Sequence, residues 1–110
     1  MTRQEIDGIM YDTASAKKLA GFDTGLETDH PMYEERGMYL TPDKRIFKHS
    51  LGGGLSHVGF QVPGGWHDGE QIKPLTPFAA MKYANKWQKN TWITSKQFRE
   101  IVDICLELRQ

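Results

Sequence analysis

The stretch from residue 38 to residue 54 constrains the fold more than any other part of this 110-residue chain. Two short runs of alternating apolar and polar residues flank Pro42 and Asp43, which suit the two central positions of a turn. The second run ends at a glycine triplet, and we expect Gly52 and Gly53 to hold positive φ angles there. The pattern predicts a β-hairpin that serves as scaffold.

Further strands are predicted on both sides of the hairpin. Residues 6–11 form a short apolar run, and residues 58–62 alternate before a turn at residues 63–65. Residues 70–75 are predicted to form an edge strand, because Pro74 has no N–H to donate to a central ladder. The chain therefore supplies three to four strands for one antiparallel sheet.

The segment before the hairpin is predicted to hold a helix and a loop. Asp12 and Thr13 are suitable N-cap residues, good helix formers follow them, and Gly21 is placed to end the helix. Residues 23–31 show no periodicity and are rich in acidic and turn-forming residues, so we expect an exposed loop. If the first third of the chain contacts a partner, this loop is the expected contact.

Two helices are predicted at the C-terminal end. Thr76 and Pro77 favour an N-cap and a first helical position, and the helix that they begin reaches residue 89 with its lysines on a solvated flank. The last helix is capped by Thr94 or Ser95. Its apolar residues are Phe98, Ile101, Val102, Ile104, Cys105, Leu106 and Leu108.

This apolar stripe is wider than the single face that a helix usually buries on a small sheet. A homodimer through the last helix would cover the excess surface with a second copy. Alternatively, the helix lies between the sheet and the preceding helix of the same chain. We favour the homodimer and leave both arrangements open.

Together these elements predict one α+β domain spanning residues 1–110, with a small antiparallel sheet of three to four strands, one short N-terminal helix and two C-terminal helices. The single Cys105 excludes an intrachain disulfide. No apolar run approaches the ~20 residues of a membrane span, and the N-terminus lacks the pattern of a secretory signal. We therefore expect a soluble cytoplasmic protein that does not enter a membrane.

The net charge is zero, but the charges are distributed unevenly along the chain. Residues 1–43 contain nine acidic and four basic residues, whereas residues 44–98 contain eight basic and two acidic residues. Such an asymmetry indicates either a partner surface or, once the chain is folded, an ordinary mixture of solvated charges.

No catalytic, metal or cofactor signature is present. The four histidines lack metal-ligand spacing, and the glycine-rich segments lack the lysine and hydroxyl residues of a phosphate-binding loop. We therefore predict no catalytic residues, no metal and no cofactor. The candidate binding residues come from the acidic loop and first hairpin arm, the aromatic segment after residue 65 and the lysine-rich helix: Glu27, Asp29, Glu34, Glu35, Trp66, His67, Lys82, Lys86 and Lys89.

Four short motifs carry a resemblance to known proteins. They are YDTxxA at 11–16, YEExxxY at 33–39, FxHxxGGxxS at 47–56 and GExIxPLT at 69–76. In these the chain resembles a group of small proteins of unassigned function found in phages and mobile elements. The resemblance implies an accessory protein that acts by binding, with inhibitors of host defence such as anti-CRISPR proteins among the possibilities. It also implies the host cell cytoplasm as the location.

Three functions remain open. The first is a non-enzymatic binding protein that contacts a host protein or protein complex. The second is a small nucleic-acid-binding protein that uses the basic region 44–98, in which aromatic residues alternate with lysines. The third is a small enzyme acting near His49, Ser56 and His67.

Overall fold

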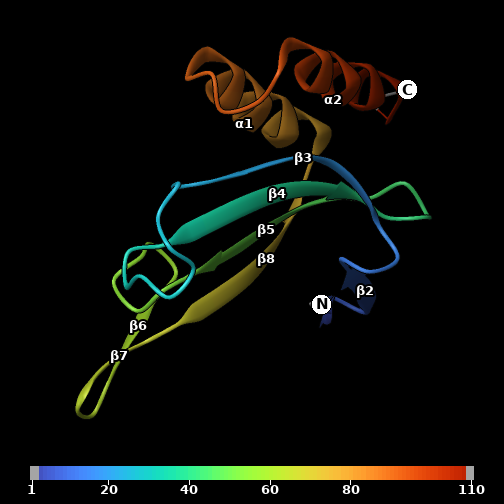
Figure 1. Ribbon diagram of the computed structural model, residues 1–110. Helices are drawn as coiled ribbons and strands as arrows, with labels where there is room; N and C mark the ends of the chain where they lie inside the picture. The colour runs from blue at the N-terminus through green and yellow to red at the C-terminus, as the bar shows by residue number, and fades with distance from the viewer. Residues whose placement is uncertain (1–2, 109–110) are drawn as a thin grey trace.

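The predicted hairpin forms the centre of the main sheet. In the computed structural model, which describes residues 3–108, β4 (Glu34–Leu40) pairs antiparallel with β5 (Ile46–Gly52) along the full length of both strands. The hairpin is therefore confirmed (Figure 1). Gly52 and Gly53 do not have positive φ angles, so that part of the prediction was wrong.

The two outer strands of the sheet lie on either side of this hairpin. β3 (Lys17–Asp23) pairs with β4, and β8 (Gly69–Leu75) pairs with β5, which gives the order β3-β4-β5-β8. The predicted edge strand is confirmed as β8, with Pro74 opposite Phe47.

The predicted N-terminal helix is wrong. Arg3–Ile6 (β1) and Ile9–Asp12 (β2) form a small hairpin, and the segment that follows becomes β3. The Asp12 side chain accepts a hydrogen bond from the N–H of Ala14 at 2.8 Å, within a turn that leads into β3. Pairing with β4 satisfies the β3 backbone and buries Leu19 and Ala20, and this burial overrides the local helix propensity.

A third hairpin lies apart from the main sheet. β6 (Phe60–Val62) pairs with β7 (Gly65–His67) around the predicted glycine turn. The predicted strand at residues 58–62 is thus present in part, and it belongs to a separate two-stranded sheet. This hairpin extends from the end of the molecule farthest from the helices (Figure 1).

Both predicted C-terminal helices are present as α1 (Pro77–Lys89) and α2 (Ser95–Leu108). The Thr76 hydroxyl accepts from the N–H of Ala79, and Thr94 and Gln97 exchange hydrogen bonds at the start of α2. Neither helix is long and apolar enough to cross a membrane. The fold of residues 3–108 is α+β, with eight strands in antiparallel sheets and these two helices.

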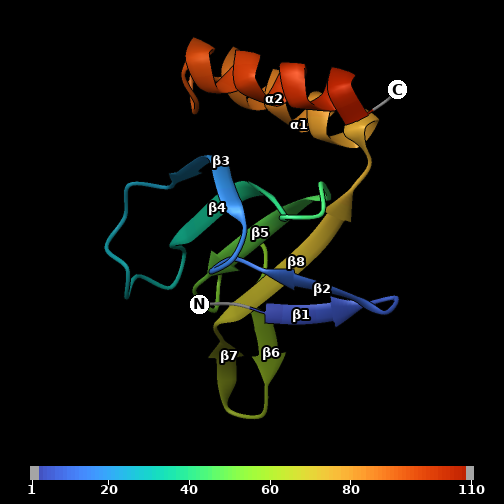
Figure 2. The same cartoon turned by 90° about the vertical axis from the view of Figure 1, so that its right-hand side faces the viewer.

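The main sheet separates two apolar clusters. On one face, the helices cover Met38, Leu40, Ile46 and Leu75, with Trp87 of α1 fully buried among them. On the other face, the β1–β2 hairpin lies across the sheet (Figure 2), and its Tyr11 packs edge-on against Phe47, with ring centroids 5.5 Å apart. The sheet is therefore the middle of three layers.

Helix α2 packs against α1 and β3, and the core includes Ile101 and Cys105. The alternative within one chain, with the last helix between the sheet and the preceding helix, is present only in part, because α1 also contacts the sheet directly through β5 and β8. Leu106 remains 48% exposed. The homodimer through α2 stays a prediction.

Gly53 should be intolerant of a side chain, for a steric reason. A Cβ atom at Gly53 would lie 2.5 Å from the backbone oxygen of Pro31, whereas a Cβ at Gly25 would meet no atom within 4 Å. We expect Gly53→Ala to lower the free energy of unfolding by ~2–3 kcal/mol. Gly25→Ala, which meets only backbone strain at φ 79°, should cost about 1–2 kcal/mol, less than Gly53→Ala.

Urea unfolding followed by circular dichroism measures both variants. If both variants lose the same free energy of unfolding, the steric clash at Gly53 adds no cost and the prediction is contradicted.

Candidate functional site

Two lysines lie side by side on the face of the sheet that α1 covers. Lys48 of β5 is directly opposite Lys73 of β8. Their Nζ atoms each lie 3.4 Å from the phenol oxygen of Tyr83 in α1, and Lys48 Nζ is also 4.4 Å from the centre of that ring. Lys48 is only 8% exposed. Tyr83 is therefore held between two ammonium groups.

This arrangement leaves two positive charges without an opposite charge beside them among the described residues. The four ion pairs of residues 3–108 include neither Lys48 nor Lys73. Like charges directly opposite each other destabilise a strand pair, and a buried charge is normally paired. Because packing alone would favour an apolar residue at Lys48, the excess positive charge points to an anionic ligand.

A cavity of about 370 Å3 opens beside Tyr83. It is lined by Lys73, Ala79, Lys82, Tyr83 and Lys86, and we call it the lysine pocket. No acidic residue lines it, and α1 contains none. Lys48 lies against the Tyr83 ring and does not line the cavity, so its charge acts on a ligand through Tyr83.

The lysines also change the acidity of Tyr83. Burial by itself raises the pKa of the phenol, but hydrogen bonds and charge from Lys48 and then Lys73 outweigh burial and bring the pKa below its ordinary value. Both lysines donate to the phenol oxygen, and among residues 3–108 the phenol hydrogen has no acceptor. Tyr83 can therefore donate a strong hydrogen bond to a bound anion.

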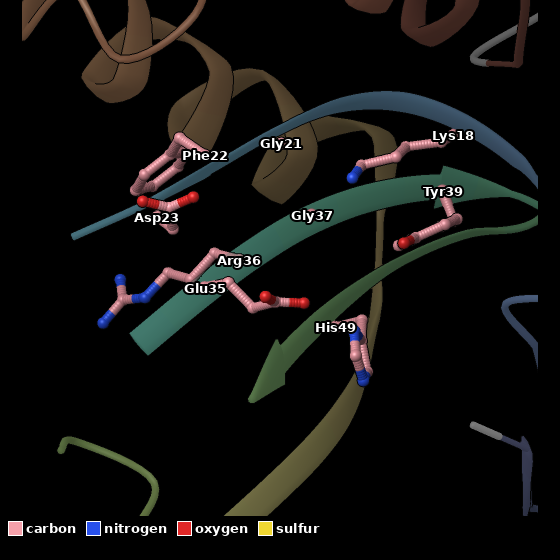
Figure 3. Close-up of a pocket in the computed structure, with 9 residues that line it drawn as sticks. All are labelled: Lys18, Gly21, Phe22, Asp23, Glu35, Arg36, Gly37, Tyr39 and His49. Carbon is pink, nitrogen blue, oxygen red and sulfur yellow. The ribbon is translucent and has the colours of Figure 1, made fainter. Parts of the chain in front are cut away.

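A second hollow lies on the opposite face of the sheet (Figure 3). Its volume is about 160 Å3, and it forms where Gly21 and Gly37 stand opposite each other in β3 and β4. Lys18, Glu35 and His49 are among the side chains around it. It is smaller than the lysine pocket, and it combines charges of both signs.

Among residues 3–108, several charged groups around this hollow, though not Lys18, already have partners. Glu35 accepts a hydrogen bond from Tyr33, which together with burial raises the pKa of that phenol to about 12. His49 Nε2 lies 2.7 Å from Glu70, and Arg36 pairs with Glu34. Since these contacts satisfy one another within the fold, the lysine pocket is the stronger candidate site.

The candidate binding residues fall in four places. Lys82 and Lys86 line the lysine pocket, and Lys89 is exposed on the same helix. Trp66 and His67 are exposed in the β6–β7 hairpin, and Glu27 and Asp29 are exposed in the predicted loop. Glu34 and Glu35 are neighbours on β4, so they point to opposite faces and engage different partners.

Three residues at the lysine pocket were not among the candidate binding residues, although they lie in the basic region 44–98: Lys48, Lys73 and Tyr83. Each occupies a position at which its own element gives no sign of a site. The register of β5 with β8 brings the two lysines together, and no single-sequence pattern specifies that register.

The three residues of the predicted small enzyme are not brought together. His49 pairs with Glu70 on β5, and His67 stacks on Phe60 in the β6–β7 hairpin. Ser56 Oγ is buried with no hydrogen-bond partner.

Burial raises the pKa of the Cys105 thiol. Within residues 3–108, no three histidine, cysteine or carboxylate side chains gather in a group that would hold a metal.

Comparisons of the chain with protein-family models, curated proteins and solved structures gave no match. Function is therefore inferred from the geometry of the site.

Tyr83, whose pKa is lowered, should ionise before Tyr39 and Tyr33, whose pKa values are raised, when the pH is raised. Absorbance of the phenolate measures this titration, with Tyr83→Phe identifying the early step. Lys48→Met should move the step to higher pH, because Lys48 lowers the pKa of Tyr83 more than Lys73 does. Lys44→Met, in the exposed turn, is the control. If the early step persists in Tyr83→Phe, the assignment of that step to Tyr83 is contradicted.

Proposed function

We propose that the protein is a non-enzymatic binding protein that holds single-stranded nucleic acid on the exposed side of α1. The observation that carries the proposal is the unpaired lysine pair, Lys48 and Lys73, around Tyr83. Phosphates are the anions that such a lysine-rich site neutralises in a nucleic acid.

The lysine pocket continues into a basic surface. Lys82, Lys86 and Lys89 follow one another at spacings of four and three residues, so they share one side of α1, with Lys82 and Lys86 ~6 Å apart along the helix axis. Phe78 begins the row and is 68% exposed. We call Lys73, Phe78, Lys82, Lys86 and Lys89 the lysine face. An exposed ring beside a row of lysines suits a single strand, whose bases stack while its phosphates are neutralised.

The structure also changes which aromatic residues can stack against bases. Of those interleaved with the basic region, Phe47 and Trp87 are fully buried and are unavailable for stacking. Phe78 takes their place beside the lysines, and Lys82 Nζ lies 5.6 Å from the centre of its ring.

Binding to a single-stranded oligonucleotide should depend steeply on salt. The slope of log affinity against log salt should become shallower by about 0.7 for each lysine lost from a phosphate contact, so by up to about 1.4 in Lys82→Gln/Lys86→Gln. Fluorescence anisotropy of a labelled oligonucleotide measures this. Lys44→Gln/Lys96→Gln removes the same charge from exposed positions outside the lysine face. Undetectable binding at low salt, or equal losses in both double variants, would contradict the proposal.

A protein partner is the second candidate, and the β6–β7 hairpin favours it. This hairpin presents Phe60 and Trp66, each at least half exposed, on a projecting segment. The resemblance to phage proteins makes a host-defence complex the first partner to test. Trp66→Ala should abolish capture of a stoichiometric host protein that Leu55→Ala, a change at another half-exposed residue, leaves intact. Capture that is equal in both variants would count against this hairpin.

A further inference from the structure

We infer that the lysine pocket binds the terminal phosphomonoester of a nucleic-acid strand, so that the protein recognises a phosphorylated strand end. This inference rests on the proposed function and assigns the lysine pocket a role distinct from that of the open lysine face.

The charge of the site exceeds that of an internal phosphate. Lys73, Lys82 and Lys86 line one cavity, and Lys48 adds a buried charge against Tyr83. An internal phosphodiester carries a single negative charge. A terminal phosphomonoester carries between about −1.5 and −2 at neutral pH, because its second pKa is about 6. The dianion therefore matches the charge at the pocket better.

The hydrogen-bonding groups also suit a terminal phosphate, which offers three free oxygens. The ammonium groups of Lys73, Lys82 and Lys86 can each donate to it. Tyr83 can donate its hydrogen as well, because the phenol oxygen already accepts from Lys48 and Lys73. Lys48 is a positioning residue that strengthens this donor from behind the ring.

The surroundings of the pocket leave a path for the rest of the strand. Lys82 lines the pocket and also lies against Phe78, so an end held in the pocket places the first nucleotides beside an exposed ring. Lys89 lies one turn beyond Lys86 and can meet a following phosphate.

The test compares oligonucleotides of one sequence that carry a phosphate at the 5′ end, at the 3′ end or at neither, with an internal fluorophore. We expect at least one phosphorylated form to bind about tenfold more tightly than the unphosphorylated form, as one added charge-assisted hydrogen bond would give. Whichever phosphorylated oligonucleotide gains affinity shows whether the pocket recognises the 5′ or the 3′ end of the strand. Anisotropy at neutral pH and constant salt measures all three.

Two variants separate recognition of the end from general binding. Tyr83→Phe removes the phenol hydrogen, and Lys48→Met removes the charge behind it, while both leave the lysine face in place. Each should abolish most of the preference for phosphate, so that the affinity for the phosphorylated strand falls more than the affinity for the unphosphorylated one. Lys96→Gln should leave both quantities unchanged. Circular dichroism shows whether each variant is folded.

Equal affinities for all three oligonucleotides, with salt-dependent binding that still requires Lys82 and Lys86, would overturn the inference and leave the proposed function standing. Absence of binding to every oligonucleotide would overturn both. A phosphotyrosine peptide that binds more tightly than any oligonucleotide, through Tyr83 and Lys48, would overturn nucleic acid as the source of the phosphate.

Discussion

The antiparallel pairing of β4 with β5 is the constraint on which the rest of the structure depends. Side chains alternate along both strands, so the register decides which residues meet the helices and which meet the β1–β2 hairpin. Met38 and Ile46 face α1 and α2, while Phe47 faces Tyr11. A shift by one residue would exchange the two sets, and each apolar cluster would lose its packing.

The same alternation creates the candidate site. Lys48 is two residues beyond Ile46 and so faces the helices, on a strand that also buries His49 and Ser50. The pairing of β5 with β8 then places Lys73 beside it, and α1 brings Tyr83 over both. Lys48 thus departs from ordinary packing without a compensating ion pair within residues 3–108. Such departures are typical of functional sites. The cost to stability is explicable if an anion supplies the missing charge.

The sequence was informative where a local signal and the tertiary structure agree. Thr76 with Pro77 and Thr94 with Gln97 mark the helix starts through contacts within four residues, and Pro74 marks an edge strand through its missing N–H. The segment after Asp12 carries a helix signal, yet pairing with β4 makes it a strand. The β1–β2 pairing was also not apparent, because four-residue strands give little periodicity. The lysines of α1 were found because their spacing is local, whereas Lys48 and Lys73 are 25 residues apart and meet only through the register.

The two phenols on opposite faces of the sheet lie in opposite electrostatic surroundings. Tyr33, beside the acidic Glu35, has a raised pKa, and Tyr83, beside Lys48 and Lys73, has a lowered one. Folding mixes the acidic first part of the chain with the basic middle in part, since Asp23 and Glu34 line a cavity with Lys86. Around Tyr83 it does not: β8 leads directly into α1, and α1 turns back over β5 and β8, so lysines from three elements converge on that residue. The acidic residues of β4 are meanwhile engaged by Arg36 and Tyr33. Because no acidic residue of the described chain lines the lysine pocket, it keeps a positive potential that an anionic partner can use.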